Sequence, residues 1–379
     1  MAQKLKITIL SLSFLTIITG AAVAPSLSVI QAYFSSVETI YIKLILTLPA
    51  LVLIPFSIIS GKCAQRYSKK KIIIFGLLLY TIGGVGGAFA FNITSLLIMR
   101  IILGVGIGII LPLSTGLIAD FYSGEERTRI MGWSTAVNNL GAVLAIMLSS
   151  SLSKLSWRYI FLIYGVAVVV LLMVILILKD PPKEEYKAHK IKINKRKLFN
   201  ISMSMFVLQV IFNAIPTNLS LFVAQEGIGS GGIAGVLLSL LTLSSFFAGV
   251  FYSRIRFMMN GYIIPISVSS ISFGFVVLSL SSHTLIIGLS VMIVGFASGL
   301  LLPTFILMGT ETASGSETSM VLAIISSSLF FGQFMAPIIS NFVQVLVGIE
   351  DIRMPFYTSA VLSVVFLIYL VRTRKSLAT

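Results

Sequence analysis

The sequence has 379 residues, of which 57% are hydrophobic and only 10% charged, and its net charge is +15. A soluble domain carries about 25% charged residues, so this chain has too little polar surface to cover a water-facing globule. One cysteine, Cys63, excludes a disulfide scaffold, and two histidines, His189 and His283, leave no conventional zinc site. The composition predicts a membrane protein with no metal and no other cofactor.

Twelve apolar runs are long enough to cross a bilayer, which takes about 20 predominantly apolar residues in a helix. We predict spans at residues 6–30, 38–60, 72–91, 95–118, 131–152, 159–178, 199–224, 231–252, 261–281, 284–308, 319–345 and 354–371. The runs are continuously apolar and do not alternate with a period of two, which excludes a transmembrane β-barrel. The predicted fold is an all-α membrane protein with twelve transmembrane helices.

The first run has a second interpretation. Lys4 and Lys6 precede an apolar stretch that ends in the small residues 22–24, as in a cleavable secretory signal. Pro25 follows these small residues directly and is unfavourable for cleavage, and the apolar character continues beyond it. We therefore expect the first run to remain as a membrane span.

The distribution of basic residues predicts the orientation, because loops rich in Lys and Arg stay in the cytoplasm. With the N-terminus inside, most of the 27 Lys and Arg residues fall on the inner side. We expect a multi-pass protein of the cell membrane with both termini cytoplasmic. Loop topology then accounts for the sequence pI of about 9.9 without any binding of nucleic acid.

One long polar segment, residues 179–198, separates the sixth span from the seventh. We predict an N-terminal six-helix bundle at residues 1–178, a cytoplasmic linker at 179–198 and a C-terminal six-helix bundle at 199–379. The basic residues of the linker favour contact with anionic lipid headgroups, and His189 within it is expected to be solvated.

The two halves repeat one another at an offset of 191 residues, the separation of Gly104 from Gly295. The same offset aligns Gly108 with Gly299, and Gly and Pro are informative because they mark backbone requirements. Further aligned pairs are Gly83 with Gly274, Pro112 with Pro303, and Gly141 with Gly332. Six spans separate the copies, so both bundles have the same orientation and form a parallel repeat.

Three stretches of the chain carry short motifs. GKCAQRYSKKK at residues 61–71 and LIMRIILGVGIG at 97–108 resemble, respectively, the cytoplasmic G-x-x-x-D-R-x-G-R-K signature and the arginine-glycine motif of the major facilitator superfamily. YSGEERTRIMGW at 122–133, with SWRYIF at 156–161, resembles the loops after the fourth and fifth spans. The resemblance covers essentially the whole chain and implies a twelve-helix transporter similar to the drug:proton antiporter branch.

The resemblance implies that residues 61–71 latch the cytoplasmic side. Gly61 is expected to let the chain leave the second helix tightly, and Arg66 to pair with a carboxylate. Gln65 stands where the family has Asp, and Asp120 is the nearest expected partner of Arg66. Arg127, in the next inner loop, completes the predicted gating group.

Arg100 is the most informative single residue, because a guanidinium inside a span costs about 2.5–3.5 kcal/mol and normally faces a bundle interior, a cavity or a partner. The alternative is that Arg100 extends to the outer interface. The resemblance assigns the matching arginine to substrate-linked proton movement. The first span has no carboxylate, so we expect coupling through Glu38, near Arg100 and Lys43, or through Glu226, with raised carboxylate pKa values. An ion pair between Glu38 and Lys43, without a role in proton coupling, is an equally good interpretation.

Polar stripes on otherwise apolar spans predict the walls of a substrate cavity, and hydrogen bonding between helices is the competing use of the same side chains. The cavity candidates are Asn138, Asn139, Gln209, Asn213, Gln333 and Phe334. The chain also has 26 Phe and 14 Met, and adaptable apolar walls of this kind favour lipophilic solutes.

These features predict a secondary transporter, acting as a monomer, that exports small lipophilic molecules in exchange for protons by alternating access. Ala142 stands where antiporters of this type usually have Pro, so proton-coupled uptake of a neutral metabolite is one alternative. A membrane-embedded enzyme or a receptor is the other. We do not expect an enzyme, because no nucleophile, base or group of metal ligands can converge within the spans.

Overall fold

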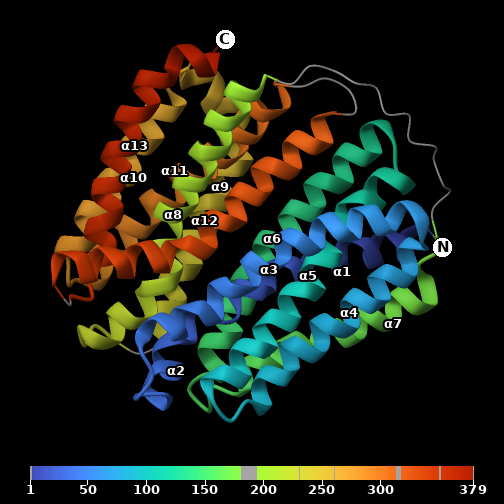
Figure 1. Ribbon diagram of the computed structural model, residues 1–379, viewed down its shortest axis with the longest axis horizontal. Helices are drawn as coiled ribbons and strands as arrows, with labels where there is room; N and C mark the ends of the chain where they lie inside the picture. Colours follow the sequence, from blue (N-terminus) through green and yellow to red (C-terminus); the bar gives the residue numbers. More distant parts are fainter. Residues whose placement is uncertain are drawn as a thin grey trace. The chain divides into compact units, whose positions relative to one another are not determined.

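The computed structural model describes residues 2–180, 194–229, 231–259, 261–312, 317–349 and 351–378. Every regular element in these ranges is a helix, as the sequence predicts. Internal contacts divide the chain into unit 1, Met1–Glu184, and unit 2, Glu185–Thr379 (Figure 1). Residues 181–193, most of the expected linker and including His189, lie outside the described residues.

Unit 1 contains the first six predicted spans. Its helices are α1 (Ala2–Ala21), η1 (Ala24–Ser26), α2 (Leu27–Tyr33), α3 (Thr39–Arg66), α4 (Lys69–Gly86), η2 (Gly87–Phe89), α5 (Ile93–Phe121), α6 (Gly124–Leu152), η3 (Tyr159–Gly165) and α7 (Val166–Ile177). Unit 2 contains the other six. Its helices are α8 (Lys195–Gln225), α9 (Gly231–Met259), α10 (Ile263–Leu280), α11 (Thr284–Thr310), α12 (Glu317–Val347) and α13 (Met354–Ala378).

Among the described residues, 12 helical segments are long and apolar enough to cross a membrane, which confirms the predicted number of spans. The main differences from the prediction are at the ends. α3 continues to Arg66 and α6 begins at Gly124, so much of what the sequence suggested as cytoplasmic loop is helical. Helix hydrogen bonds within the backbone persist after the apolar residues end, and hydropathy alone does not detect such extensions.

The first span is interrupted, and Pro25 explains the interruption. α1 ends at Ala21, Pro25 occupies the first turn of the short 3-10 helix η1, and α2 resumes at Leu27. Proline has no backbone N–H and clashes with the preceding turn, so a continuous α-helix cannot pass through it without distortion. The predicted span at residues 6–30 is confirmed as Gln3–Tyr33, but it is not one continuous α-helix.

Equivalent helices pack in the same way in the two units, which confirms the parallel repeat. α5 packs against α3 and α4 in unit 1, and α11 packs against α9 and α10 in unit 2. A methyl group added at Gly108 would lie 2.8 Å from the carbonyl oxygen of Leu53 on α3, and one added at Gly299 would lie 2.9 Å from Ala248 on α9. Each glycine thus permits the same close approach in its own half.

Candidate functional site

Arg100 lies in the interior of unit 1, on α5, with 0% of its surface exposed. Its Nη1 donates a 3.1 Å hydrogen bond to the hydroxyl of Tyr164, and its Nη2 donates one of 3.4 Å to the carbonyl of Gly84. The rings of Phe161 and Tyr164 lie 4.7 and 4.9 Å from the guanidinium carbon, within the range of cation–π attraction. The alternative in which Arg100 extends to the outer interface is therefore wrong.

Two tyrosines connect this arginine to the first helix. The Tyr164 hydroxyl donates to the carbonyl of Thr19 at 2.9 Å, and the Tyr80 hydroxyl donates to the carbonyl of Leu15 at 2.9 Å. The two tyrosine rings meet edge to face, with centroids 5.9 Å apart. Among the described residues no carboxylate forms an ion pair with Arg100, so ring faces, a hydroxyl and a carbonyl dipole stabilise its charge.

Glu38 and Lys43 lie close together in the sequence but do not form an ion pair. Glu38 is exposed and precedes the first residue of α3, whereas Lys43 is 4% exposed on the second turn. The only ion pairs among the described residues are Lys69–Asp120 and Arg353–Glu226. The structure therefore brings Glu38 into an ion pair with neither Lys43 nor Arg100.

Glu226 follows the last residue of α8 and is bound by Arg353. The guanidinium Nε and Nη2 donate to the two carboxylate oxygens at 2.9 and 2.6 Å, forming a bidentate pair. Nη2 also donates to the Ser282 hydroxyl at 2.6 Å, and Nη1 donates to the carbonyl of Ser279 at 3.0 Å. Arg353 thus joins the end of α8 to the last turn of α10 and to the segment that follows it.

The ion pair with Arg353 favours the ionised form of Glu226. The hydrogen bonds and positive charge of Arg353 lower the pKa of Glu226 below its ordinary value of 4.5, and limited desolvation opposes this. The expectation of a raised pKa is wrong for Glu226 in this conformation, because a cation contacts both oxygens. Sequence reasoning missed Arg353, which is 127 residues away along the chain.

The basic segment between the second and third spans has a different partner from the predicted one. Lys69, the first residue of α4, donates to both carboxylate oxygens of Asp120 at 2.9 and 2.7 Å. Arg66 and Arg127 are exposed and form no ion pair among the described residues, and Gln65 is exposed as well. The predicted pairing of Arg66 with Asp120 is wrong, because α3 continues to Arg66 and the chain turns only after it.

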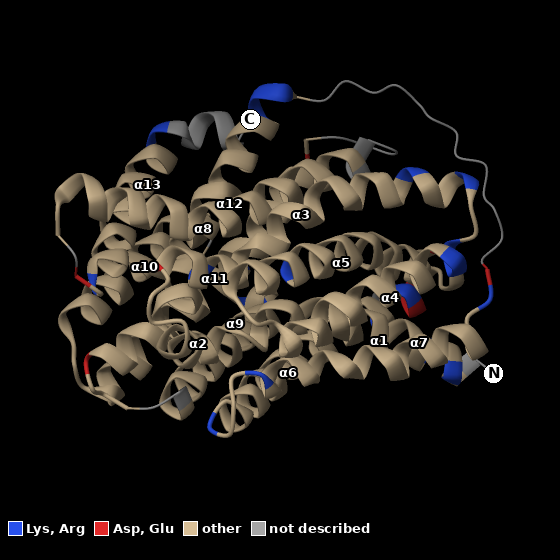
Figure 2. Cartoon of the chain, turned by 60° about the horizontal axis from the view of Figure 1, so that its bottom comes forward, with Lys and Arg blue, Asp and Glu red and all other residues tan. Residues whose placement is uncertain are grey.

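Gly61 does not mark the exit from the second span. It lies inside α3, and a methyl group added there would contact nothing within 4 Å. Lys and Arg residues are nevertheless concentrated in the backbone segments where α3 ends and α4 begins (Figure 2). The basic character of this segment is therefore retained, but the tight turn expected at Gly61 is not.

Asp180, which follows the sixth span, binds the N-terminal end of α4. Its carboxylate accepts from the Ser68 hydroxyl at 2.6 Å and from the Lys70 backbone N–H at 3.0 Å. Partial desolvation opposes the effect, but these hydrogen bonds and nearby lysines lower the pKa of Asp180 below its ordinary value. A serine before an apolar run is a sequence signal for a helix start at Ser68, but nothing local points to Asp180 as its partner.

The polar stripe on α8 is largely occupied within its own helix. Asn213 Nδ2 donates to both the backbone carbonyl and the side-chain oxygen of Gln209, at 2.9 Å each. The Thr217 hydroxyl donates to the carbonyl of Asn213 at 2.6 Å. All three residues are buried. The stripe is where the sequence predicts it, and its hydrogen bonds limit how many polar groups it can offer to a solute.

The remaining cavity candidates lie on α6 and α12. Asn139 donates to the carbonyl of Thr135 at 2.9 Å, while the side-chain oxygen of Asn138 is buried without a partner in the described residues. Gln333 and Phe334 are half-buried on α12. No group of three or more His, Cys, Asp or Glu residues that could hold a metal ion occurs within the described ranges.

Two repeated six-helix units whose spans carry sparse polar groups define a membrane transporter. The sequence profile of the Major Facilitator Superfamily matches residues 9–337, so the chain belongs to this superfamily and the resemblance seen in its motifs is confirmed. It is a multi-pass membrane transporter, and the family implies a small-molecule substrate.

Sequence relatives include the Quinolone resistance protein NorA of Staphylococcus aureus, which is 26% identical over 229 residues. That match covers 55% of this chain and spans 58% of the length of NorA. Among solved structures, a bacterial homolog of the human lysosomal transporter Spinster, inward-facing and occupied, matches with a TM-score of 0.80 and 15% identity over 98% of this chain and 96% of that one. The nucleoside transporter NupG (D323A mutant) has a TM-score of 0.81 and 14% identity, covering 97% and 99%. These two structural likenesses establish the fold alone.

Proposed function

We propose that this transporter exports small, mainly lipophilic molecules from the cytoplasm in exchange for protons. It does so as a monomer in the cell membrane, with both termini cytoplasmic. The observation that carries the proposal is the sequence likeness to NorA, whose name describes resistance to quinolones. The two repeated units provide the pair of bundles that alternating access requires.

The predicted cavity residues support a lipophilic substrate. The amides of Gln209 and Asn213 bond to one another, so α8 offers few free polar groups for recognising a sugar or a nucleoside. Recognition then depends on aromatic and methionine side chains, which adapt to varied shapes. We still expect changes at these two amides, and at Asn138, Asn139, Gln333 and Phe334, to alter substrate binding.

Proton coupling is assigned to Glu38 and Glu226, with Arg100 in support. In the described conformation Arg353 holds Glu226 in its ionised form. To carry a proton, Glu226 must leave Arg353 in another state of the cycle, because its pKa rises only when the cation withdraws. Replacing both carboxylates, in Glu38→Gln with Glu226→Gln, should abolish proton-driven transport. Full activity in that double variant would remove these residues from the coupling mechanism.

Inverted membrane vesicles test the direction and the coupling. With an acidic lumen, vesicles containing the protein should accumulate lipophilic dyes and quinolones, and a protonophore should abolish the accumulation. Vesicles without the protein are the control for passive partition. Substrate accumulation that instead requires an alkaline lumen would identify proton symport and would replace export by uptake. No accumulation of any lipophilic compound in either gradient would exclude the proposed substrate class.

A further inference from the structure

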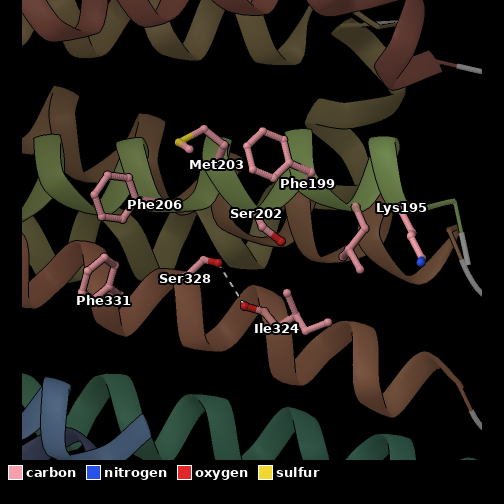
Figure 3. A pocket seen from close by; sticks show the side chains of 9 residues that line it. Lys195, Phe199, Ser202, Met203, Phe206, Ile324, Ser328 and Phe331 are labelled. Atoms are coloured by element: carbon pink, nitrogen blue, oxygen red, sulfur yellow. Dashed lines mark hydrogen bonds between the residues drawn. The ribbon is translucent and has the colours of Figure 1, made fainter.

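Unit 2 contains an apolar groove between α8 and α12, with a cavity volume of about 460 Å³. We call it the α8–α12 groove. Its lining residues are Lys195, Leu198, Phe199, Ser202, Met203 and Phe206 on α8, and Ile324, Ser328 and Phe331 on α12 (Figure 3). On each helix they recur every three or four residues, so each set occupies one helical face.

The groove has a charged end and an aromatic end. Lys195, the first residue of α8, is the only charged residue that lines it within the described part of the chain. At the other end the rings of Phe206 and Phe331 stack, with centroids 5.6 Å apart and planes 30° from parallel. Between these ends Phe199 is 61% exposed and Met203 is 37% exposed, so the walls are apolar and uncovered within the described residues.

The length of the groove matches one leaflet of a bilayer. From Lys195 to Phe206, α8 rises by about 17 Å at 1.5 Å per residue. Half of a hydrocarbon core of about 30 Å is about 15 Å. With Lys195 at the level of the headgroups, the stacked Phe206 and Phe331 rings therefore lie near the middle of the bilayer.

The positive charge at the Lys195 end of the groove favours a negatively charged ligand group. Arg196 and Lys197 follow Lys195, and all three lie in the first turn of a 31-residue helix, whose N-terminal end carries a partial positive charge. None of the carboxylates in the described ranges lines the groove. An anionic headgroup is favoured at this end, whereas the apolar walls accept an acyl chain.

One of the residues that line the groove has a buried hydroxyl without a partner in the described ranges. Ser202 is 9% exposed and its Oγ has no hydrogen-bond partner among the described residues, whereas the neighbouring Ser204 donates to the carbonyl of Asn200 at 2.7 Å. In Figure 3 the Ser202 hydroxyl points into the space between the two helices. An unpartnered polar group at this position is consistent with a groove that a further molecule covers.

We propose that the α8–α12 groove binds one acyl chain of an anionic phospholipid of the inner leaflet, with the lipid phosphate at Lys195. The choice of the inner leaflet rests on the proposed cytoplasmic orientation of Lys195. The binding itself is a property of unit 2 and is distinct from transport of a substrate. The groove would anchor α8 and α12 to the lipid on the side where the linker ends.

Native mass spectrometry of the purified full chain tests this proposal with phosphatidylglycerol and phosphatidylcholine as probes. The wild type should retain phosphatidylglycerol at least threefold more than phosphatidylcholine. Met203→Trp, which fills the middle of the groove, and Ser328→Phe, which obstructs it from the facing helix, should each reduce retained phosphatidylglycerol severalfold. Lys195→Gln should remove the preference for the anionic lipid.

Arg196→Gln is the matched control, because it removes a charge from the same turn without lining the groove. It should reduce the preference for phosphatidylglycerol less than Lys195→Gln does, because Arg196 does not line the groove. Undiminished retention in both groove-filling variants would overturn the proposal, as would an equal loss of preference in Lys195→Gln and Arg196→Gln. The readout is retained lipid rather than transport. If the vesicles accumulate no substrate but the variants change lipid retention as expected, the export function is rejected and the lipid site is supported.

Discussion

The Arg100 guanidinium and the Tyr164 hydroxyl are 3.1 Å apart in the interior of unit 1, and the same tyrosine ring also faces the guanidinium carbon at 4.9 Å. Tyr164 therefore contacts the buried charge through both its hydroxyl and its ring. In addition its hydroxyl donates to Thr19, so that α5, η3 and α1 meet at one side chain.

Tyr164→Phe should destabilise the protein by about 1–3 kcal/mol, because it leaves a buried guanidinium N–H and the Thr19 carbonyl unpaired while retaining the ring. Thermal unfolding in detergent measures the effect. Tyr159→Phe is a suitable control because Tyr159 is 46% exposed. An equal change in unfolding temperature for the two variants would show that the hydroxyl bonds of Tyr164 contribute nothing specific.

The Lys69–Asp120 ion pair should couple energetically, whereas Arg66 and Asp120 should not. Both partners are partly exposed, so the coupling free energy of unfolding should be only about 0.5–1 kcal/mol. A double-mutant cycle with Lys69→Gln and Asp120→Asn measures it. The control cycle pairs Arg66→Gln with Asp120→Asn and should be additive. Coupling confined to the control cycle would restore the pairing that the sequence suggested.

The ion pair of Glu226 should make part of the stability depend on pH. Because its pKa is lower in the folded protein than the ordinary value of 4.5, the pair stabilises the fold above that value and is lost as pH falls through the folded pKa. Glu226→Gln should therefore be less stable than wild type at pH 7, by about 1 kcal/mol for a partly exposed bidentate pair. The difference should shrink in acid.

Unfolding temperatures of wild type and Glu226→Gln between pH 3 and pH 7 check this prediction. Glu38→Gln is the matched control, since it removes an exposed carboxylate that belongs to no ion pair among the described residues. A stability difference for Glu226→Gln that stays constant over this range would contradict the assigned role of Arg353.

The spans and the repeat could be predicted from the sequence because both depend on local or periodic patterns. Apolar runs define a membrane helix without knowledge of its neighbours, and Gly104 and Gly295 reveal a shared packing requirement by their fixed offset. The departures at Pro25 and Gly61 come from backbone geometry, which composition specifies less closely. A proline stops α1, whereas a single glycine is tolerated within α3.

The ion pairs could not be predicted in the same way. Glu226 meets Arg353 across 127 residues, and Asp180 meets Ser68 across 112, so each contact depends on how helices pack rather than on spacing. Arg66 was the expected partner of Asp120 from a motif, but the actual partner, Lys69, lies just beyond the turn between α3 and α4. Where several basic residues lie in a row, sequence predicts a charge on that face and not which residue forms the contact.

Substitution of the repeated glycines by alanine should distinguish two effects on stability, the loss of close helix packing and the gain in helix propensity. An alanine methyl group at Gly104 would lie 2.8 Å from the Cβ of Val52 and 3.0 Å from the Pro49 backbone, so α3 and α5 must move apart. Gly104→Ala should destabilise the protein by about 1–3 kcal/mol. Gly295→Ala should behave alike in unit 2, where the methyl group would contact the Leu241 carbonyl and the Ser244 hydroxyl.

Gly116→Ala provides the control on the same helix as Gly104, because a methyl group there contacts nothing within 4 Å. It should be neutral or slightly stabilising, since alanine is favoured over glycine in a helix by up to about 1 kcal/mol. Gly249→Ala serves the same purpose in unit 2, on α9. Thermal unfolding of the four single variants in one detergent compares them directly. If Gly104→Ala and Gly295→Ala unfold at the same temperatures as their controls, the repeated glycines do not set the distance between these helices. Their alignment in the two halves would then reflect no shared packing requirement.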